Sequence, residues 1–214
     1  LEKTLVNRIQ INENYYLLPL SKLFLENQEL IKKLTFYRNK YKKYYPTQFK
    51  ATFVSTKNWI KKLLLTKNRI MFLLINKENS ICGIMGLLKH QNSINNLEID
   101  NVIKFENCND KNIFSKVLQK LLKFSKEILF VENIQLKVMN TNLRAINYYK
   151  KNGFKFIFKI PLIRKVLKNK TVLIESSYKK ISEKINGTFF YLMEYQELKI
   201  KKKKNLILTG GPSI

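Results

Sequence analysis

Hydrophobic and polar positions alternate along this chain in patterns that predict both strands and helices. Alternating or continuous hydrophobic runs predict strands, and a spacing of three and four residues predicts helices. The predicted strands cover residues 15–20, 69–76, 80–89, 97–103, 134–138, 154–158 and 188–195. The predicted helices cover residues 21–34, 56–65, 112–130 and 143–152. Residues 161–187 are expected to form an irregular, lysine-rich insertion.

The segment Leu136–Phe158 has the most distinctive pattern, in which a strand, a helix and a second strand follow one another closely. Residues 140–142 (Asn-Thr-Asn) carry side chains that cap a helix N-terminus. Gly153 follows the predicted helix, where glycine is favoured because it adopts a left-handed conformation without steric cost. Phe154 then opens a run in which every second residue is phenylalanine, as in a strand.

Five positions in this segment, spaced N-x-x-A-x-x-x-Y-x-x-x-G-F, resemble the acyl-CoA-binding second half of the GNAT superfamily of N-acyltransferases. They are Asn142, Ala145, Tyr149, Gly153 and Phe154. The alternative is an ordinary surface helix capped by glycine beside an aromatic core stripe. The resemblance implies an α+β, three-layer domain with the GNAT fold. That fold is a twisted, mixed and mostly antiparallel sheet of about seven strands flanked by helices.

The resemblance also implies where acetyl-CoA, the expected co-substrate, binds. In GNAT enzymes the strand before the long helix splays away from the strand before the capped helix, and the acyl-CoA lies between them. Backbone groups of the first strand contact the pantetheine arm, while the next loop and the positive helix end hold the pyrophosphate. The matching residues are Val102, Ile103 and Lys104 for pantetheine, Asn109, Lys111, Asn112, Ile113 and Phe114 for pyrophosphate, and Asn142, Ala145 and Tyr149 on the second helix. No metal is expected.

The chain departs from the family pattern in the pyrophosphate turn, which usually contains glycines. No glycine lies between Gly86 and Gly153. Asn109 and Asn112 are expected to supply left-handed backbone geometry instead, and Lys111 a charge contact. The departure leaves open a weakened cofactor site or a non-catalytic relative.

Amide formation from an amine and a thioester needs a base for the amine and a proton for the leaving thiolate. Tyr149 matches the family position whose hydroxyl reaches the CoA sulfur, so it is the candidate general acid; alternatively, it only packs. Tyr148 is discounted because neighbouring helical residues point in different directions.

Glu98 is the candidate base, because several GNAT families place a carboxylate on this strand. Asp100 points to the same face of the strand, and two nearby carboxylates can raise one pKa. The alternative roles are acceptor binding and a structural hydrogen bond. His90, the sole histidine, is a further candidate, although a lone histidine is more often incidental.

The net charge of +26 is the dominant compositional feature. Only five of the 41 basic residues are Arg, whereas specific base or phosphate recognition relies more on arginine. Lys, Asn and Ile are also residues that A/T-rich codons favour, so genome composition and a functional basic surface both remain open. Either way, the positive field favours anionic ligands and repels polycations such as spermidine.

Residues 38–45 (RNKYKKYY) interleave basic and aromatic side chains. Such a segment suits single-stranded nucleic acid, and it equally suits an acceptor loop that stacks a base or sugar and neutralises phosphates. Trp59 is expected to pack in the core. Gly83 and Gly86 lie within one predicted strand and indicate a bulge or a close backbone approach.

The surroundings of the motifs resemble the GNAT branch that acetylates amino sugars for surface polysaccharides. The matching segments are 56–65 (TKNWIKKLLL), 97–103 (LEIDNVI) and Pro161-Leu162. The predicted function is therefore transfer of an acetyl group to the amine of a nucleotide-linked amino sugar. The alternatives are a protein or peptide N-acetyltransferase and a basic nucleic-acid-binding module without catalysis.

The predicted domain spans residues 1–198, followed by a basic linker (199–205) and the segment 206–214 (LILTGGPSI). That last segment resembles the start of DegT-type, pyridoxal-phosphate-dependent sugar aminotransferases, and the alternative is a disordered terminus. No hydrophobic run is long enough to cross a bilayer. Cys82 and Cys108 form no metal or disulfide framework, so a cytoplasmic location is expected.

Overall fold

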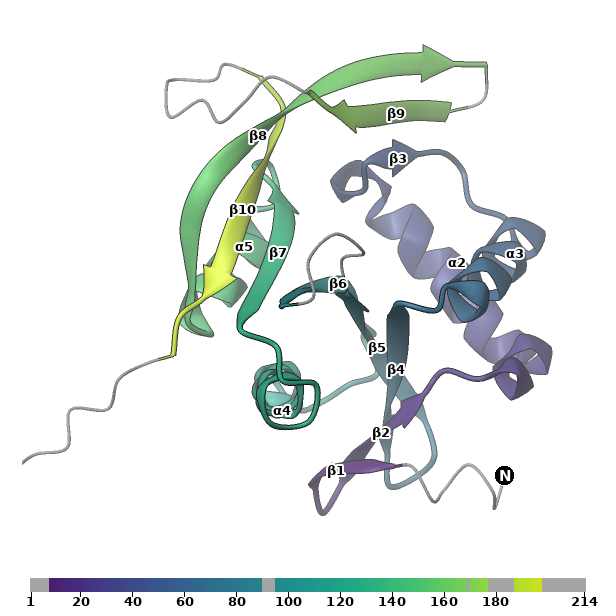
Figure 1. The fold of residues 1–214 in the computed structure, drawn as a ribbon. Helices are drawn as coiled ribbons and strands as arrows, with labels where there is room; N and C mark the ends of the chain where they lie inside the picture. Colours follow the sequence, from purple (N-terminus) through teal and green to yellow (C-terminus); the bar gives the residue numbers. More distant parts are fainter. Residues whose placement is uncertain (1–7, 90–94, 169, 177–186, 198–214) are drawn as a thin grey trace, which may run out of the picture.

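The computed structural model describes residues 8–89, 95–168, 170–176 and 187–197. Within these residues ten strands form a sheet in the order β1-β2-β4-β5-β6-β7-β10-β8-β9-β3 (Figure 1). Neighbouring strands run antiparallel, except for the parallel pair β6 and β7. The strands are β1 (Ile9–Asn12), β2 (Tyr15–Pro19), β3 (Thr47–Gln48), β4 (Arg69–Asn76), β5 (Ile81–Lys89), β6 (Asn96–Lys104), β7 (Asn133–Met139), β8 (Phe154–Leu167), β9 (Lys170–Glu175) and β10 (Phe189–Tyr195).

Helices cover both faces of the sheet, which confirms the predicted three-layer α+β architecture (Figure 1). On one face Leu30 and Ile60 pack in a core formed with α2 and α3. On the other face Val117 and Ile146 pack in a core formed with α4 and α5. The helices are α2 (Gln28–Lys40), α3 (Phe53–Leu65), α4 (Ile113–Glu127) and α5 (Leu143–Lys151), with short 3₁₀ helices at Lys22–Glu26 and Lys42–Tyr44.

The first long helix begins later than predicted. A 3₁₀ helix follows β2, and α2 begins at Gln28 because the side chain of Asn27 accepts a hydrogen bond from the Leu30 N–H. An N-cap of this kind satisfies a backbone donor that the helix itself leaves without a partner. Helix α2 then continues to Lys40, so it includes the first residues of the basic–aromatic segment 38–45.

The prediction of an irregular insertion over residues 161–187 is wrong for its first half. Strand β8 continues to Leu167, and β9 pairs with it in an antiparallel hairpin. Most of these positions are exposed or half-buried, so the alternation of buried and exposed residues that marks a sheet strand is weak here. The hairpin is held by the hydrogen bonds between β8 and β9 rather than by burial of one face. Together with the short strands β1 and β3, this hairpin raises the strand number from about seven to ten.

The same hairpin reaches the loop between α2 and α3 (residues 41–51). We call it the acceptor loop, after one of the two roles predicted for residues 38–45. Strand β3 in this loop pairs with β9, and the Leu173 N–H donates to the Pro46 carbonyl at 2.7 Å. Figure 1 shows β8 curving over the domain so that β9 lies beside β3. A segment late in the chain therefore holds a loop that comes early in it.

A β-bulge at Asn101 divides β6 into two parts. Asn101 has a φ of 49°, and the register with β5 shifts at this point. Ile99 consequently packs in the α4–α5 core, whereas Ile103, four residues later, packs in the α2–α3 core. Glu98 and Asp100 alternate with Leu97 and Ile99 and therefore point toward the α2–α3 side. An extra residue in a strand exchanges the two faces for everything that follows, so the bulge brings Ile103 onto that same side.

The two glycines of β5 lie where the backbone is approached closely, as predicted. A Cβ atom on Gly86 would lie 2.1 Å from the Asp100 Oδ1 atom. A Cβ atom on Gly83 would lie 2.3 Å from the Ile103 carbonyl oxygen. Both glycines are therefore required by the packing of β5 against β6.

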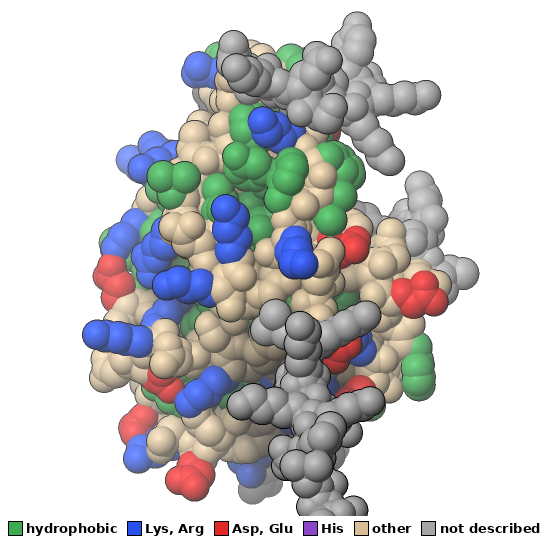
Figure 2. Space-filling model, turned by 90° about the vertical axis from the view of Figure 1, so that its left-hand side faces the viewer, with side chains coloured by type: hydrophobic (Ala, Val, Ile, Leu, Met, Phe, Trp, Pro, Cys, Tyr) green, Lys and Arg blue, Asp and Glu red, His purple; other side chains and the backbone are tan. Residues whose placement is uncertain are grey.

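The surface carries its positive charge over a broad area. Figure 2 shows Lys and Arg side chains spread among neutral and hydrophobic areas on the face it presents. Cys82 and Cys108 are both free and buried. Among the described helices, none is long and apolar enough to span a membrane. Residues 199–214, with the predicted linker and the aminotransferase-like segment, lie outside the described residues.

Candidate functional site

Strands β6 and β7 pair over only three positions before they part. The last register pair joins Glu98 to Gln135. Beyond it β6 continues beside β5 to Lys104, and β7 continues beside β10 to Met139. The predicted pantetheine-binding residues 102–104 therefore lie on the edge of β6 beyond the point of parting. This is the splayed arrangement that the family resemblance implies.

The side chains of these three residues are already used within the protein. Ile103 is buried, and Val102 packs partly against the α4–α5 core. The Lys104 ammonium donates to the carbonyl of Asp110 at 2.7 Å. A ligand along this edge would therefore bind backbone groups, as the prediction requires.

The loop before α4 is shaped by Asp110 rather than by left-handed residues. The Asp110 carboxylate accepts a hydrogen bond from the Asn112 N–H at 2.7 Å. Asn112 has a φ of −102°, and Asn109 is not among the described residues with positive φ. The prediction of left-handed asparagines is therefore wrong, because an aspartate side chain that bonds the backbone two residues on closes the turn without positive φ.

The predicted pyrophosphate residues divide into two kinds. Ile113 and Phe114 have buried side chains, so only their N–H groups are suited to contact an anion. Asn109 and Lys111 are exposed on the same turn. The Asn112 side chain makes no capping hydrogen bond, and a helix N-terminus carries partial positive charge that favours an anion. The residues present therefore fit a pyrophosphate group.

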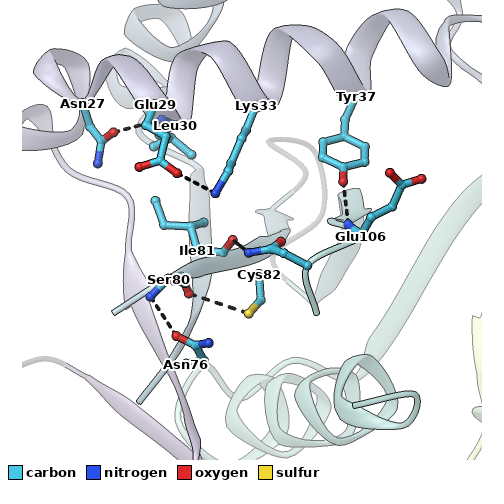
Figure 3. A network of polar contacts seen from close by, with 11 residues as sticks. Asn27, Glu29, Leu30, Lys33, Tyr37, Asn76, Ser80, Ile81, Cys82 and Glu106 are labelled. Atoms are coloured by element: carbon cyan, nitrogen blue, oxygen red, sulfur yellow. Dashed lines mark hydrogen bonds and ion pairs between the residues drawn. The ribbon is translucent and has the colours of Figure 1, made fainter. Parts of the chain in front are cut away.

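Helix α2 is tied to the strand end that leads into this loop (Figure 3). The Tyr37 hydroxyl accepts a hydrogen bond from the Glu106 N–H. The Tyr37 ring stacks on Phe105 with the ring centroids 4.6 Å apart. Lys40 forms an ion pair with the Glu106 side chain. The loop before α4 is thus fixed relative to the helix that leads into the acceptor loop.

Helix α5 begins and ends as its sequence predicts. The Asn142 side chain accepts a hydrogen bond from the Ala145 N–H at 3.2 Å, so Asn142 has a capping role. Ala145 packs partly against the core. Gly153 follows the helix with a φ of 91°, a conformation that favours glycine.

The adjacent tyrosines of α5 have different environments. The Tyr148 hydroxyl donates to the Phe114 carbonyl at 2.8 Å and so joins α5 to α4. Tyr149 is buried, and burial raises its pKa above the ordinary range, with the charges of Tyr45 and Asp100 adding to the effect. Tyr149 therefore stays protonated at neutral pH, close to residues of the acceptor loop and of β6.

The carboxylates of β6 lie close together but differ in their partners. One oxygen of Asp100 lies 2.9 Å from the Arg69 guanidinium and accepts from the Asn101 amide. The other is buried against Gly86 without a hydrogen-bond partner among the described residues. Burial raises the pKa of Asp100 to about 6, Arg69 opposes the rise, and the charge of Glu98 adds to it.

Glu98 lies at the last register pair before β6 and β7 part, and it is half-buried. Because Asp100 is held by Arg69, it has the contacts of a structural residue, and Glu98 remains the predicted base. His90 lies outside the described residues.

A pocket of about 400 Å³ lies on the α2–α3 side of the sheet, beside the bulge of β6. Its lining combines basic and aromatic side chains and contains no Asp or Glu among the described residues. The lining residues are Arg38, Lys42, Tyr45, Pro46, Thr47, Phe49, Ala51, Trp59, Lys62, Asn101 and Ile103.

Tyr45 and Trp59 are the two largest aromatic side chains of this lining. Burial raises the pKa of Tyr45 to about 12, and its charge contributes to the raised pKa of Tyr149. Trp59 packs against the α2–α3 core as expected, but it is only partly buried and also forms part of the pocket wall. The basic–aromatic segment 38–45 therefore contributes Arg38, Lys42 and Tyr45 to a pocket that also contains Asn101 and Ile103 of β6.

The sequence did not indicate the role of Arg69 or of Asn101. Arg69 lies on β4 and meets Asp100 only because β5 aligns the two strands. Asn101 provided a weak signal, because asparagine tolerates the left-handed conformation better than most residues. Among the described residues, no group of three or more His, Cys, Asp or Glu is arranged to hold a metal ion.

Comparisons with known proteins agree with this geometry. The model of the acetyltransferase (GNAT) family matches residues 34–154, which is more than half of the chain. The fold is similar to that of spermidine N-acetyltransferase from Vibrio cholerae, solved with CoA and spermine. The two are 14% identical, with a TM-score of 0.58 over 86% of this chain and 95% of that one.

Two further solved structures have a similar fold. RimL, an α-N-acetyltransferase of the ribosomal protein L7/L12, is 11% identical with a TM-score of 0.64, over 88% of this chain and 93% of that one. A GNAT-family acetyltransferase from Bacillus anthracis is 17% identical with a TM-score of 0.59, over 87% and 96%. At such identities the likeness shows the fold alone. No curated protein sequence matches the chain.

Proposed function

Because the chain belongs to the acetyltransferase (GNAT) family, we propose that it transfers an acetyl group from acetyl-CoA to the amine of a nucleotide-linked amino sugar. Membership of the family makes the chain an acyl-CoA-dependent N-acetyltransferase, and acetyl-CoA supplies the acetyl group as a thioester. The choice of acceptor is the proposal. One observation carries it: among the described residues, the pocket beside β6 is lined by basic and aromatic side chains and by no Asp or Glu.

On the cofactor side, we assign the predicted backbone edge and helix end to acetyl-CoA. The edge of β6 at residues 102–104 would bind the pantetheine arm, and the N–H groups of Ile113 and Phe114 would bind the pyrophosphate. Support comes from the parting of β6 and β7 after Glu98 and from the uncapped N-terminus of α4. Lys111 lies exposed on the same turn and would add a charge contact.

For the chemical step, Glu98 accepts a proton from the acceptor amine, directly or through a water. Tyr149 donates its hydroxyl proton toward the leaving sulfur. The hydroxyl is protonated at neutral pH, as a general acid must be, although burial raises its pKa further from the range in which proton transfer is easiest. Asp100, held by Arg69, adds negative charge beside Glu98 and positions the bulge.

The charge of the pocket distinguishes between acceptor classes. Arg38, Lys42 and Lys62 would attract the phosphates of a nucleotide-linked sugar, and aromatic side chains in the same lining suit a base or a sugar ring. A polyamine would be repelled by the same side chains. The similarity in fold to the Vibrio cholerae spermidine enzyme, with 14% identity, is therefore not a reason to propose spermidine as the acceptor of this chain.

A direct test measures thiol release from acetyl-CoA with three acceptors: a UDP-linked amino sugar, spermidine and a peptide with a free N-terminus. The expected result is saturable turnover with the nucleotide-linked sugar and little with spermidine. Preferred turnover of the peptide would overturn the proposal in favour of a protein N-acetyltransferase. Calorimetric titration with acetyl-CoA supplies the control, because about one site per chain is expected whichever acceptor is correct.

A further inference from the structure

We propose that Arg38 is the residue that recognises the phosphate of the acceptor, in a preformed site between two aromatic rings. The inference rests on the proposed function for the identity of the acceptor, and it adds the group that selects it. A substrate carrying a phosphodiester or diphosphate would bind at Arg38. The same amino sugar without a nucleotide would not gain from this contact.

The geometry around Arg38 is that of a fixed cation. Its guanidinium carbon lies 4.6 Å from the centroid of the Trp59 ring and 5.3 Å from that of Phe49. One of its terminal nitrogens donates to the Thr56 hydroxyl at 3.3 Å. The Thr56 hydroxyl is in turn hydrogen-bonded to the Thr35 hydroxyl of α2, with the two oxygens 2.9 Å apart. Contacts from α3 and from the acceptor loop thus hold the side chain that α2 supplies.

The charge of Arg38 is not neutralised by the protein. No ion pair to Asp or Glu is present for Arg38 in the described part of the chain, whereas Arg69, the other arginine held by side-chain contacts within the fold, is paired with Asp100. Burial lowers the pKa of Arg38, which reflects the loss of water around the charge. A charge removed from water is unfavourable unless it is paired.

An anion in the pocket would supply the missing partner. The planar guanidinium forms two parallel hydrogen bonds to phosphate, and stacking on aromatic rings holds it ready to do so. Lys42 and Lys62 line the same pocket and are exposed, so they can approach a second phosphate oxygen or a second phosphate. This arrangement favours a diphosphate over a single carboxylate.

The acceptor loop is also held in a defined conformation before any ligand binds. The Asn39 side chain donates to the Ala51 carbonyl at 2.9 Å and accepts from its N–H at 2.8 Å, which closes the base of the loop. The pairing of β3 with β9 holds its far side. Phe49 is therefore placed beside Arg38 by contacts at both ends of the loop, and little ordering remains for the ligand to bring about.

The experiment compares the parent with Arg38→Met, which removes the charge, and Arg38→Lys, which keeps the charge but loses the planar fork. Arg8→Gln is the matched control, because Arg8 also lies over an aromatic ring, 5.8 Å from the Tyr16 centroid, but is exposed and is not part of the pocket lining. Thermal unfolding of each variant establishes that it is folded before it is assayed.

For Arg38→Met we expect the KM of the nucleotide-linked acceptor to rise about ten- to a hundredfold, since charge-assisted hydrogen bonds are of that strength. The KM of acetyl-CoA should stay unchanged. Arg38→Lys should recover only part of the loss, and Arg8→Gln should behave as the parent. With the amino sugar lacking the nucleotide, the parent and Arg38→Met should be equal. An equal loss for both acceptors would overturn the proposal and leave Arg38 with a purely structural role.

A second measurement separates this proposal from the proposed function. Inorganic pyrophosphate is titrated into the parent and into Arg38→Met by calorimetry, with and without saturating acetyl-CoA. We expect binding to the parent that survives acetyl-CoA and is lost in the variant, even if no amino sugar is acetylated. Displacement by acetyl-CoA would place the anion in the cofactor site, and equal binding to both proteins would show that Arg38 does not hold it. Either result would overturn the proposal.

Discussion

The two proposed sides of this site, one for the cofactor and one for the acceptor, are built in different ways. The cofactor side comes from one nearly continuous stretch, residues 96–154, in which strand, helix, strand and helix follow in chain order. The acceptor side combines α2, the acceptor loop and α3 with the bulge of β6, and it is held by the hairpin of β8 and β9. Segments more than a hundred residues apart therefore meet on the acceptor side.

Because different contacts hold the two sides, we expect substitutions on one side to leave the other side intact. On the cofactor side, short-range rules such as capping at Asn142 and the glycine at position 153 place the helix end. On the acceptor side, cations and aromatic rings are arranged by long-range pairing between β3 and β9. We expect variants of the first side to affect the chemical step and variants of the second to affect acceptor binding.

The largest effect is expected for Tyr149→Phe. Loss of the hydroxyl should lower kcat about a hundredfold or more, since general acid–base catalysis contributes on that scale, while acetyl-CoA binding remains. Tyr148→Phe is the matched control, because it removes a hydroxyl from the adjacent residue whose hydrogen bond goes to the Phe114 carbonyl. It should cost about 1 kcal/mol of stability with little change in kcat. For both variants, thiol release measures kcat and calorimetric titration measures acetyl-CoA binding. A Tyr149→Phe variant with parental turnover would exclude Tyr149 as the acid.

The next largest effect is expected where the two sides meet, at the ion pair of Arg69 and Asp100. Arg69→Met should lower the free energy of unfolding by about 3 kcal/mol near neutral pH, because it leaves Asp100 buried without a counterion. The loss should be smaller near pH 5, where a carboxyl with a raised pKa is protonated.

The sign of this pH dependence follows from the pKa of Asp100, which burial raises to about 6. The folded protein binds a proton that the unfolded chain has released, so in the parent this residue makes the free energy of unfolding fall as pH rises from about 4 to about 6. Urea unfolding across this range tests the assignment. Asp100→Asn should remove this contribution, and an unchanged slope would show that another group titrates.

A smaller effect is expected when the support of the acceptor loop is weakened. Leu173→Pro removes the N–H that donates to the Pro46 carbonyl, because proline has no backbone donor. The KM of the acceptor should rise several-fold to about tenfold, the cost of one hydrogen bond and some loop order, with the KM of acetyl-CoA unchanged. Leu173→Ala keeps the N–H and loses only the buried side chain, so it is the control. If both variants raise the acceptor KM equally, the hydrogen bond does not hold the loop.

The sequence predicted the helix and strand order well where local signals agree with the tertiary structure. Residues 136–158 carry a cap, a C′ glycine and alternating hydrophobic positions, and β7, α5 and β8 follow them closely. The turn before α4 differs from the prediction because two kinds of local chemistry can close it. The Asp110 side chain does so here, where left-handed asparagines were expected.

The sequence by itself determined the family and the α+β class, and it predicted which residues line the cofactor edge, because these depend on spacing within one short stretch. Only the tertiary structure decided the strand number, the bulge at Asn101 after which the two faces of β6 are exchanged, and the pairing of Arg69 with Asp100. It alone brought Arg38, Trp59 and Phe49 into one pocket wall. The physical reason is that periodicity reports which face of an element is buried, whereas a pocket depends on which distant elements pack together.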